Sequence, residues 1–309
     1  MNKMEKKSPN TDDLKHTKRR NYEKNKITRL QNIIKKQNEV IKETLNHDKI
    51  RIEFFANLSH EFRTPLNLIF NSLQLCNVII KRDNLDESKK LTTYINIINQ
   101  NCYRLIRLTN NMIDMTKIDA GFSELNLDNF NIINIVENIT LSVVEYVRNK
   151  GINLTFDTNV EEKIMACDAD KIERIILNLI SNAIKFTEQG GYLYVTVTDM
   201  GRNVKISVKD TGTGIPKEKL NGIFKRFVQA GKPCKSDQAG SGIGLCLVKS
   251  FVEMHGGTID VKSRLGCGTE FIIDLPVKTI ENKKTVHDTQ FNYDDKIDRI
   301  NIEFSDIYV

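Results

Sequence analysis

Apolar side chains recur at alternating three- and four-residue steps between residues 52 and 80, and this spacing strongly constrains the fold. The positions are Ile52, Phe55, Phe62, Leu66, Ile69, Leu73, Cys76 and Ile80, with Ser59 at the one polar step. Sustained spacing of this kind is typical of a helix that packs on partner helices. The stretch therefore predicts a long helix ending near Arg82, where Asp83 and Asn84 favour a turn.

A second seam with the same spacing follows the turn. Its members are Leu91, Ile95, Ile98, Cys102, Leu105, Thr109, Met112 and Met115. Two long amphipathic helices joined by a short turn make a helical hairpin, which alone leaves much of its apolar surface in water. We therefore expect a homodimer in which two hairpins form a four-helix bundle.

His60 lies one residue off the first seam, so its imidazole is expected to face solvent. Glu61 follows directly, and Thr64 lies one turn later on the same face as the histidine. Pro65 lacks an N–H group and should bend the helix just beyond the histidine. An exposed histidine, a carboxylate, a hydroxyl and a bend together indicate a reaction site, although a solvated histidine on the flank of a packed helix is the plain alternative.

The chain has 309 residues, which is long enough for two compact domains and a linker. Its net charge of +6 is unevenly placed, because residues 1–50 hold 14 Lys and Arg against 7 Asp and Glu. Such a basic arm could contact nucleic acid or anionic lipid. A solvated basic coiled coil is favoured, since the arm has no interleaved aromatic residues beyond Tyr22, and we expect no nucleic-acid partner.

The N-terminal arm has its own seam, which runs into the first long helix. Its positions are Ile27, Leu30, Ile34, Gln37, Ile41, Leu45, Asp48 and Ile52. One extra four-residue step near residues 41–45 makes a stutter, which locally unwinds a coiled coil. The stutter is either a conduit for signals into the helix or a helix end without further meaning.

The six cysteines show no C-x-x-C pair and no clustering with histidine, so we expect reduced thiols rather than disulfides or a zinc site. No stretch approaches ~18 uninterrupted apolar residues, and no signal peptide opens the chain. The sequence thus predicts a cytoplasmic protein, with membrane association only through a sensor that is missing or on a separate chain.

After Gly121 the pattern changes to alternating helices and strands. Helices are expected at residues 132–150, 170–187 and 217–227, and from Ala239 to His255, which we interpret as part of a helix-ending turn. Strands are expected at residues 153–157, 163–167, 192–198 and 204–209, followed by two final strands. This order predicts an α/β sandwich with helices on one face of a mixed sheet.

Three clusters in this part suit a nucleotide. Asn178, Asn182 and Lys185 share one helix face, where amide oxygens suit Mg²⁺ and lysine suits phosphate. The run from Asp210 to Ile215, D-T-G-T-G-I, follows a strand, and its carboxylate can accept a hydrogen bond from an adenine amine. The run from Gly240 to Leu245, G-S-G-I-G-L, opens a helix whose N–H groups can meet phosphate oxygens.

Each cluster also has a plainer interpretation: a polar helix face, a turn, or the glycine motif of a dinucleotide-binding fold. The last is disfavoured because that motif belongs after the first strand of a βαβ unit, not late in a chain. Together, the three clusters favour an ATP site.

Residues 54–66 resemble the H-box of bacterial sensor histidine kinases, with the pattern F-x-x-x-x-S-H-E-[LF]-R-T-P-L. The three clusters are similar to that family's N-box, G1-box and G2-box. Phe224–Phe227 resembles the F-box, and Gly266–Phe271 the closing glycine motif. The resemblance covers about residues 50–277, in the family's order.

The resemblance implies four regions. They are a basic arm and signalling coiled coil at 1–49, a dimerisation and histidine-phosphotransfer domain at 50–119, a catalytic GHKL (Bergerat) ATP-binding domain at 120–278, and a tail at 279–309. In the tail, Ile297, Ile300, Ile302 and Phe304 could add a strand or cover a patch on the ATP-binding domain, or the tail could be disordered.

The resemblance also implies roles for individual residues. Asn178 and Asn182 are expected at Mg²⁺ and phosphate, Lys185 at phosphate, Asp210 at adenine and Arg226 at the terminal phosphate. Residues 229–240 would form a lid over ATP. Further nucleotide contacts are expected from Phe186, Gly212, Gly214, Ile215, Phe224, Phe227, Gly240, Gly242, Gly244, Leu245 and Thr269.

The implied function is transfer of the γ-phosphoryl group of Mg-ATP to His60, with Glu61 accepting the ring proton, and then to an aspartate on a response regulator. Thr64 matches the family's H-E-x-x-T pattern, which implies dephosphorylation of the regulator. Two alternatives remain: a GHKL-type ATPase, in which Glu173 would be the base, and an ATP-binding scaffold without phosphotransfer.

Overall fold

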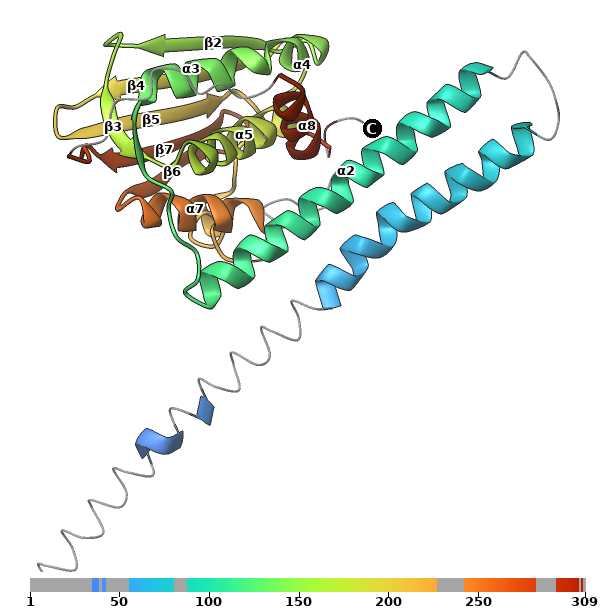
Figure 1. Cartoon of the computed structure of the whole chain (residues 1–309), viewed down its shortest axis with the longest axis horizontal. Coiled ribbons are helices and arrows are strands. Elements are labelled where there is room, and N and C mark those ends of the chain that lie inside the picture. The colour runs from blue at the N-terminus through green and yellow to red at the C-terminus, as the bar shows by residue number, and fades with distance from the viewer. Residues whose placement is uncertain are drawn as a thin grey trace, which may run out of the picture. The chain divides into compact units, whose positions relative to one another are not determined.

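The structure is a computed structural model, and it describes residues 35–38, 41–42, 56–80, 88–226, 242–281, 293–305 and 307. Residues from Leu58 onward form one compact unit, and the account below concerns that unit (Figure 1). Residues 35–38 and 41–42 are helical, and the expected stutter and most of the N-terminal arm lie outside the described residues. No helix among the described residues is long and apolar enough to cross a membrane.

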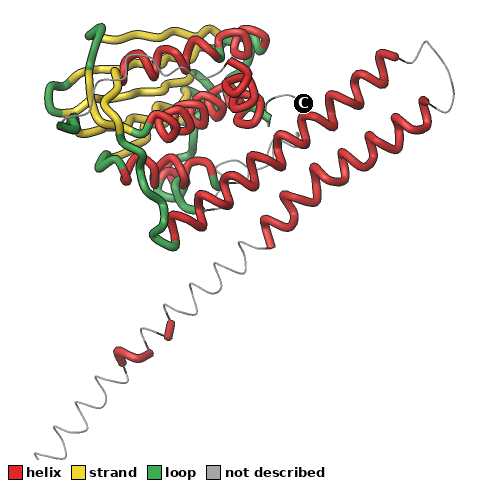
Figure 2. The backbone as a smooth tube through the Cα atoms, viewed as in Figure 1, coloured by secondary structure: helices red, strands yellow, loops and turns green. Residues whose placement is uncertain are grey.

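The two expected long helices are present. The first occupies residues 56–80, and α2 (Ser88–Asp119) follows it (Figure 2). Arg104 Nη2 on α2 lies 3.6 Å from Glu61 Oε2, so the helices contact each other side by side. The first helix continues unbroken through Pro65, which is buried, while the turn expected near Arg82 lies outside the described residues. The bend expected at Pro65 stays a prediction.

The first seam is only partly covered within one chain. Its member Cys76 is buried, as are Leu58 and Ser72, which lie one residue before the seam positions Ser59 and Leu73. Leu66, Leu73 and Ile80 are 53%, 47% and 63% exposed. The apolar stripe is therefore wider than one hairpin partner can cover.

The ATP-binding part is built on a five-stranded mixed sheet of order β2-β4-β5-β7-β6. The strands are β2 (Asn153–Thr158), β4 (Tyr192–Asp199), β5 (Asn203–Asp210), β7 (Gly268–Pro276) and β6 (Thr258–Arg264). Strands β2 and β4 pair in parallel, and the other neighbours are antiparallel. Helices α3 (Ile132–Ser142), α5 (Ala169–Phe186) and α7 (Gly244–Met254) lie on one face of the sheet (Figure 1).

The core lies between the sheet and these helices. Alternate residues of β5, Val204, Ile206 and Val208, are buried, as the two-residue period of a strand requires. They pack in one cluster with residues of α5, including Ile176 and Ile180, which are fully buried. The expected α/β sandwich with helices on one face of a mixed sheet is confirmed.

Two expected helices differ in extent, and the helix expected from Ala239 begins later, at Gly244 of α7, since residues 242 and 243 are not helical. The helix expected over residues 132–150 is two helices, α3 and α4 (Val144–Asn149), which break at Val143. Just before the break, the hydroxyls of Thr140 and Ser142 donate to the carbonyls of Val136 and Ile139, and this kind of bonding bends helices.

The helix expected at 217–227 is only the short α6 (Lys217–Leu220), which ends as the chain turns toward Gly222. A strand that the sequence did not predict, β1 (Asp128–Asn131), pairs antiparallel with β3 (Ile164–Cys167) in a separate two-stranded sheet.

The tail forms a helix, α8 (Tyr293–Glu303), rather than a strand. Ile300, Phe304 and Ile307 are buried in the common core, and the Phe304 ring lies 5.6 Å from the ring of Tyr146. The tail thus covers a patch on the ATP-binding part, as one of the sequence alternatives held.

We expect Phe304→Ala to lower the free energy of unfolding by about 3–5 kcal/mol, because it removes a fully buried ring and leaves a cavity. Ile297→Ala, on the exposed side of α8, should cost under about 1 kcal/mol. Urea unfolding followed by circular dichroism measures both. Equal small losses would show that α8 does not belong to the core.

Candidate functional site

The helix that carries Asn178 is α5, and its start is held by Asp168. The Asp168 side chain caps α5 by accepting from the N–H of Lys171 at 3.1 Å. Its other oxygen accepts from the N–H of Asn126 at 2.9 Å. A carboxylate that satisfies free N–H groups at a helix start stabilises that helix end. These contacts fix the position of the polar face of α5.

His255 ties the end of α7 to the start of α5. Its Nε2 accepts from the N–H of Asp168 at 3.1 Å, and its Nδ1 lies 2.7 Å from the carbonyl oxygen of Phe251. Because Nε2 accepts, the neutral ring carries its proton on Nδ1, which donates to that carbonyl. Burial lowers the pKa of His255, against the smaller opposing effects of the Phe251 carbonyl and the Asp168 charge. The residue lies in a helix-ending turn, as expected.

Asn178 meets the glycine that opens α7. A Cβ built on Gly244 would lie 2.5 Å from Asn178 Nδ2, so the two helices approach closely only because residue 244 is glycine. Asn182 Nδ2 donates to Asn178 Oδ1 at 3.2 Å. Lys185 lies further along the same helix, with its ammonium 5.8 Å from the ring centroid of Phe186. The structure therefore brings the first and third predicted clusters together.

Asp210 ends β5 and is buried. Its Oδ1 accepts from the N–H groups of Gly212 and Thr269, at 2.8 and 3.1 Å. Burial raises the pKa of this carboxyl, and the two N–H bonds partly offset the rise. Both bonds fall on one oxygen, which leaves Oδ2 as the atom suited to accept a hydrogen bond from an amine.

Glycines let this loop pack against neighbouring backbone. A Cβ on Gly212 would lie 2.2 Å from the Phe186 carbonyl oxygen, and one on Gly214 would lie 2.1 Å from the Arg264 carbonyl oxygen. Ile215 donates its N–H to Ser263 Oγ at 2.7 Å. The second cluster is thus fitted against the end of α5 and the β6–β7 turn.

The remaining predicted contacts are spread over neighbouring elements. Phe224 packs edge-on against Phe271, with ring centroids 6.3 Å apart. Gly242 has a φ of +67°, which suits glycine, and Leu245 is half-buried against the core. Phe227, Gly240 and the expected lid at 229–240 lie outside the described residues.

Arg226 pairs with a carboxylate on α2. Its guanidinium forms a two-pronged ion pair with Asp119 at the end of α2, with Nη1 2.7 Å from Asp119 Oδ2. Planar pairing of this kind is strong for an exposed pair. In this arrangement, the arginine expected at the terminal phosphate is held by α2.

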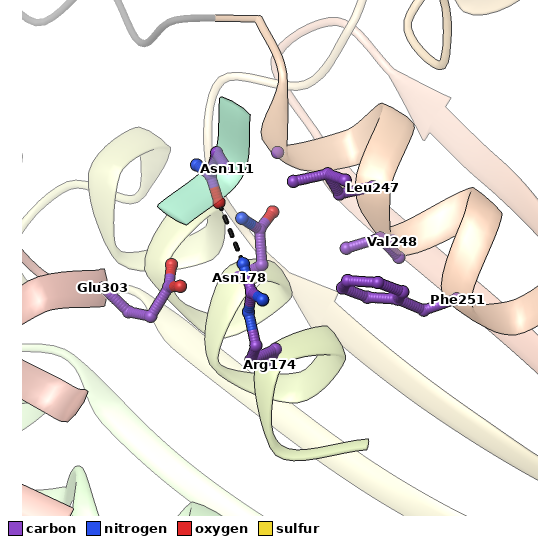
Figure 3. A pocket seen from close by; sticks show the side chains of 8 residues that line it. Asn111, Arg174, Asn178, Leu247, Val248, Phe251 and Glu303 are labelled. Carbon is purple, nitrogen blue, oxygen red and sulfur yellow. Dashed lines mark hydrogen bonds between the residues drawn. The ribbon is translucent and has the colours of Figure 1, made fainter. Parts of the chain in front are cut away.

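A small cavity lies beside Asn178 (Figure 3). Its lining residues are Asn111, Arg174, Asn178, Gly244, Leu247, Val248, Phe251 and Glu303. Its volume is about 10 Å³, close to the smallest space that holds one water molecule. Two of the four elements that meet here, α5 and α7, were expected at the site, but side chains of α2 and of the tail were not.

The contact with α2 is polar. Arg174 on α5 pairs with Asp114, and its Nη2 donates to Asn111 Oδ1 at 3.1 Å. The guanidinium also lies 5.3 Å from the centroid of the Phe251 ring. Arg107, Asn111 and Asp114 share one face of α2 at four- and three-residue steps, which is the sequence signal that could have identified this contact.

The predicted reacting residues lie on the first helix. His60 is exposed, as expected. Thr64 is also exposed, and its Oγ1 donates to the His60 carbonyl oxygen at 3.3 Å. Glu61 is half-buried and faces Arg104. Among the described residues, no hydrogen bond or ion pair joins His60 to the three clusters.

The residues present fit a nucleotide and a hard cation. Asp210 offers a buried acceptor, and Gly212 and Gly244 let the Asp210 loop and the start of α7 pack closely on α5. The amides of Asn178 and Asn182 are oxygen donors of the type that Mg²⁺ takes, and Lys185 adds a positive charge.

Known families match both parts of the chain. Residues 50–121 match the His Kinase A (phospho-acceptor) domain, and residues 167–279 match the histidine kinase-, DNA gyrase B- and HSP90-like ATPases. The chain therefore belongs to the histidine kinases, with their phospho-acceptor domain and an ATP-binding domain of this ATPase family.

Individual proteins agree with this assignment. Hybrid signal transduction histidine kinase D of Dictyostelium discoideum is 35% identical over 85% of this chain and 17% of its own length. Sensor protein SrrB of Staphylococcus aureus is 32% identical over 75% of this chain and 39% of its own. A crystal structure of histidine kinase ThkA in complex with response regulator protein TrrA is 27% identical, covers 73% of this chain and 61% of that chain, and has a TM-score of 0.55. The chain spans less than half of either curated relative.

We expect the stability of the folded chain to fall as the pH drops below about 6.5, the ordinary pKa of histidine. The folded-state pKa of His255 is lower than that value, so protons bind the unfolded chain more tightly and favour it. One such group contributes up to about 1.4 kcal/mol per pH unit.

Urea unfolding from pH 8 to pH 5 measures this slope. His255→Gln should be less stable at pH 8 and should lack this part of the slope, while the acidic residues contribute equally to both proteins. An identical slope in the variant would exclude His255 as its source.

Proposed function

We propose that the chain is the kinase core of an autophosphorylating histidine kinase, which transfers the γ-phosphoryl group of ATP to His60 and from there to an aspartate of a response regulator. One observation carries the proposal: a chain with an exposed His60 on a hairpin also packs Asn178 against Gly244 and buries Asp210 before a glycine loop that packs on the end of α5. A phosphoryl acceptor and a nucleotide site thus occur together.

Different residues of the site bind the adenine and the phosphates of ATP. Asp210 Oδ2 accepts the adenine amino group, while Gly212, Gly214, Ile215 and Thr269 shape the pocket around the ring. Lys185 and the N–H groups at the start of α7 hold the phosphates. Phe186, Phe224, Phe227 and Leu245 supply apolar walls, and Gly240 and Gly242 let the lid close.

Mg²⁺, held by the side-chain oxygens of Asn178 and Asn182, would neutralise charge on the phosphates. Because Asn178 Oδ1 accepts from Asn182 in the described arrangement, at least one amide must reorient to bind it.

Phosphotransfer needs little covalent chemistry from the protein. One ring nitrogen of neutral His60 forms a bond to the γ-phosphorus, while the bond from that phosphorus to the bridging oxygen of ADP breaks. Glu61 accepts the proton from the other ring nitrogen, which holds the tautomer and makes the attacking nitrogen more nucleophilic. Arg226 must leave Asp119 before it can stabilise charge on the terminal phosphate.

The proposal includes a homodimer. The exposed row of Leu66, Leu73 and Ile80 supports it, because a second hairpin would cover these side chains in a four-helix bundle. The complex of the similar kinase ThkA with its regulator TrrA supports a response regulator as the second partner. The division at residues 49, 119 and 278 and the cytoplasmic location belong to the same proposal.

The structure disfavours the ATPase alternative. Glu173, the residue considered as its base, is buried and pairs with Arg299 of α8, with Oε2 2.7 Å from Nη1. A carboxylate held in this way is poorly placed to activate water for hydrolysis. The match to a phospho-acceptor domain also favours phosphotransfer over hydrolysis or simple scaffolding.

Incubation with ATP labelled on the γ-phosphate tests the proposal. Wild type should acquire acid-labile, alkali-stable label, and His60→Gln should acquire none, because the acceptor is lost. Asp210→Asn should lose most label, because its amide cannot replace the acceptor at adenine without reorienting.

Label that survives in His60→Gln would identify a different nucleophile. ATP turnover without label on any protein would favour the ATPase alternative.

Thr64→Ala should retain autophosphorylation within about twofold but dephosphorylate the phosphorylated regulator more slowly, on the order of 10–100-fold, as expected when a water is no longer positioned. The test uses a receiver domain that accepts phosphate from this kinase. Thr93→Ala is a matched control, since the Thr93 hydroxyl also donates to the carbonyl one turn earlier, at 3.0 Å. Equal decay rates for wild type and Thr64→Ala would contradict this role.

A further inference from the structure

Helix α8 is fixed to the ATP-binding part by apolar contacts, a hydrogen bond and ion pairs. Phe304 is fully buried against Tyr146, and Ile300 lies in the same core. Ser181 Oγ on α5 donates to the Glu303 carbonyl oxygen at 3.1 Å. Arg299 pairs with both Asp170 and Glu173 of α5, at 2.7 Å each. Helix α8 therefore moves with α5.

The opposite side of α8 contacts α2 through polar groups. Arg107 Nε lies 3.1 Å from Glu303 Oε2, with both side chains largely buried. Gln100 Nε2 donates to the Ser305 carbonyl oxygen at 3.1 Å, and the hydroxyl of Tyr103 donates to Asp298 Oδ1 at 3.2 Å. The Tyr103 hydroxyl contact is exposed, and none of these polar contacts buries an aromatic ring, as Phe304 does on the α5 side. The α2 side is therefore the side that can release.

The docked arrangement covers the phosphate end of the nucleotide site. Glu303 and Asn111 line the same cavity as Asn178 and Gly244, and this cavity has room for about one water. While α2 is docked, Arg107 holds the Glu303 carboxylate at this cavity. Asp119, which lies on α2 like Asn111, also pairs with Arg226.

We infer that α8 is an autoinhibitory latch, which holds α2 over the phosphate end of the ATP site through Gln100, Tyr103 and Arg107. Release of these contacts uncovers Asn178, frees Arg226 and lets the ATP-binding part reach His60. The inference rests on the proposed kinase function for its effect on phosphotransfer, whereas its effect on nucleotide binding stands without it.

Charge reversal on α2 tests the latch in the full chain. Arg107→Glu places two carboxylates together and should tighten binding of mant-ATP with Mg²⁺ by about fivefold or more, the range of an ordinary coupling between two states. The rate of γ-label incorporation should rise by a similar factor. Arg107→Lys, which keeps the charge, should stay close to wild type.

Two further variants complete the test. Lys89→Glu makes the same change of charge at an exposed position near the start of α2 and should leave both measurements unchanged. Tyr103→Phe removes only the hydroxyl that reaches Asp298. It should modestly raise both the affinity for mant-ATP and the rate of label incorporation, and it keeps the test valid if Arg107→Glu fails to fold. Thermal melts establish folding.

The test distinguishes failure of the latch from failure of the proposed kinase function. Folded Arg107→Glu and Tyr103→Phe with unchanged or weaker mant-ATP binding would overturn the latch, whatever the label shows. Tighter mant-ATP binding without label on His60 in any protein would uphold the latch and reject the kinase function.

Discussion

The approach of Gly244 to the amide of Asn178 is the contact on which the nucleotide end of the domain depends. It sets how closely α7 lies beside α5, and through it the N–H groups at the start of α7 lie next to the polar face of α5. The two helices are joined again through His255 and Asp168, near the other end of α7. Contacts at both ends of α7 hold it in a fixed position beside α5. The glycine loop that follows Asp210 packs against the end of α5.

A second set of contacts joins the ATP-binding part to the hairpin. They are mostly pairs of opposite charge: Arg174 with Asp114, Arg226 with Asp119, and Arg107 with Glu303. The exposed pair of Arg226 with Asp119 is sensitive to salt, and the other two pairs are polar contacts that are partly or largely buried, whereas the core between α5 and the sheet is apolar. The ATP-binding part is thus held together by apolar packing, whereas its contacts with α2 are mostly polar. A kinase whose ATP must travel to a histidine on another element needs this difference.

The sequence predicted the elements that depend on local periodicity. The two long helices, the polar face of α5 and the strands β4 and β5 follow from spacing, and the structure has them close to the expected residues. The break at Val143 was missed because it arises from hydroxyls that bond back to their own helix, which leaves the apolar pattern intact. The tail was ambiguous because Ile300, Ile302 and Phe304 alternate as in a strand, while Ile297, Ile300 and Phe304 have helical spacing. The contact with α2 was missed because charged residues on a helix face look the same whether they meet solvent or a partner.

The chain order of the sheet has a consequence for how the family can diversify. Strands β5 and β7 are neighbours in the sheet, yet α6, the lid region, α7 and β6 all lie between them in sequence. The connection between α6 and α7 joins two helices and not two neighbouring strands, so its length affects the fold chiefly through loop closure. Doubling that length would cost only about 0.6 kcal/mol. Lids of different lengths and sequences can therefore be exchanged during evolution at little risk to the scaffold, and the part of the site that closes over the nucleotide can vary faster than the part that holds it.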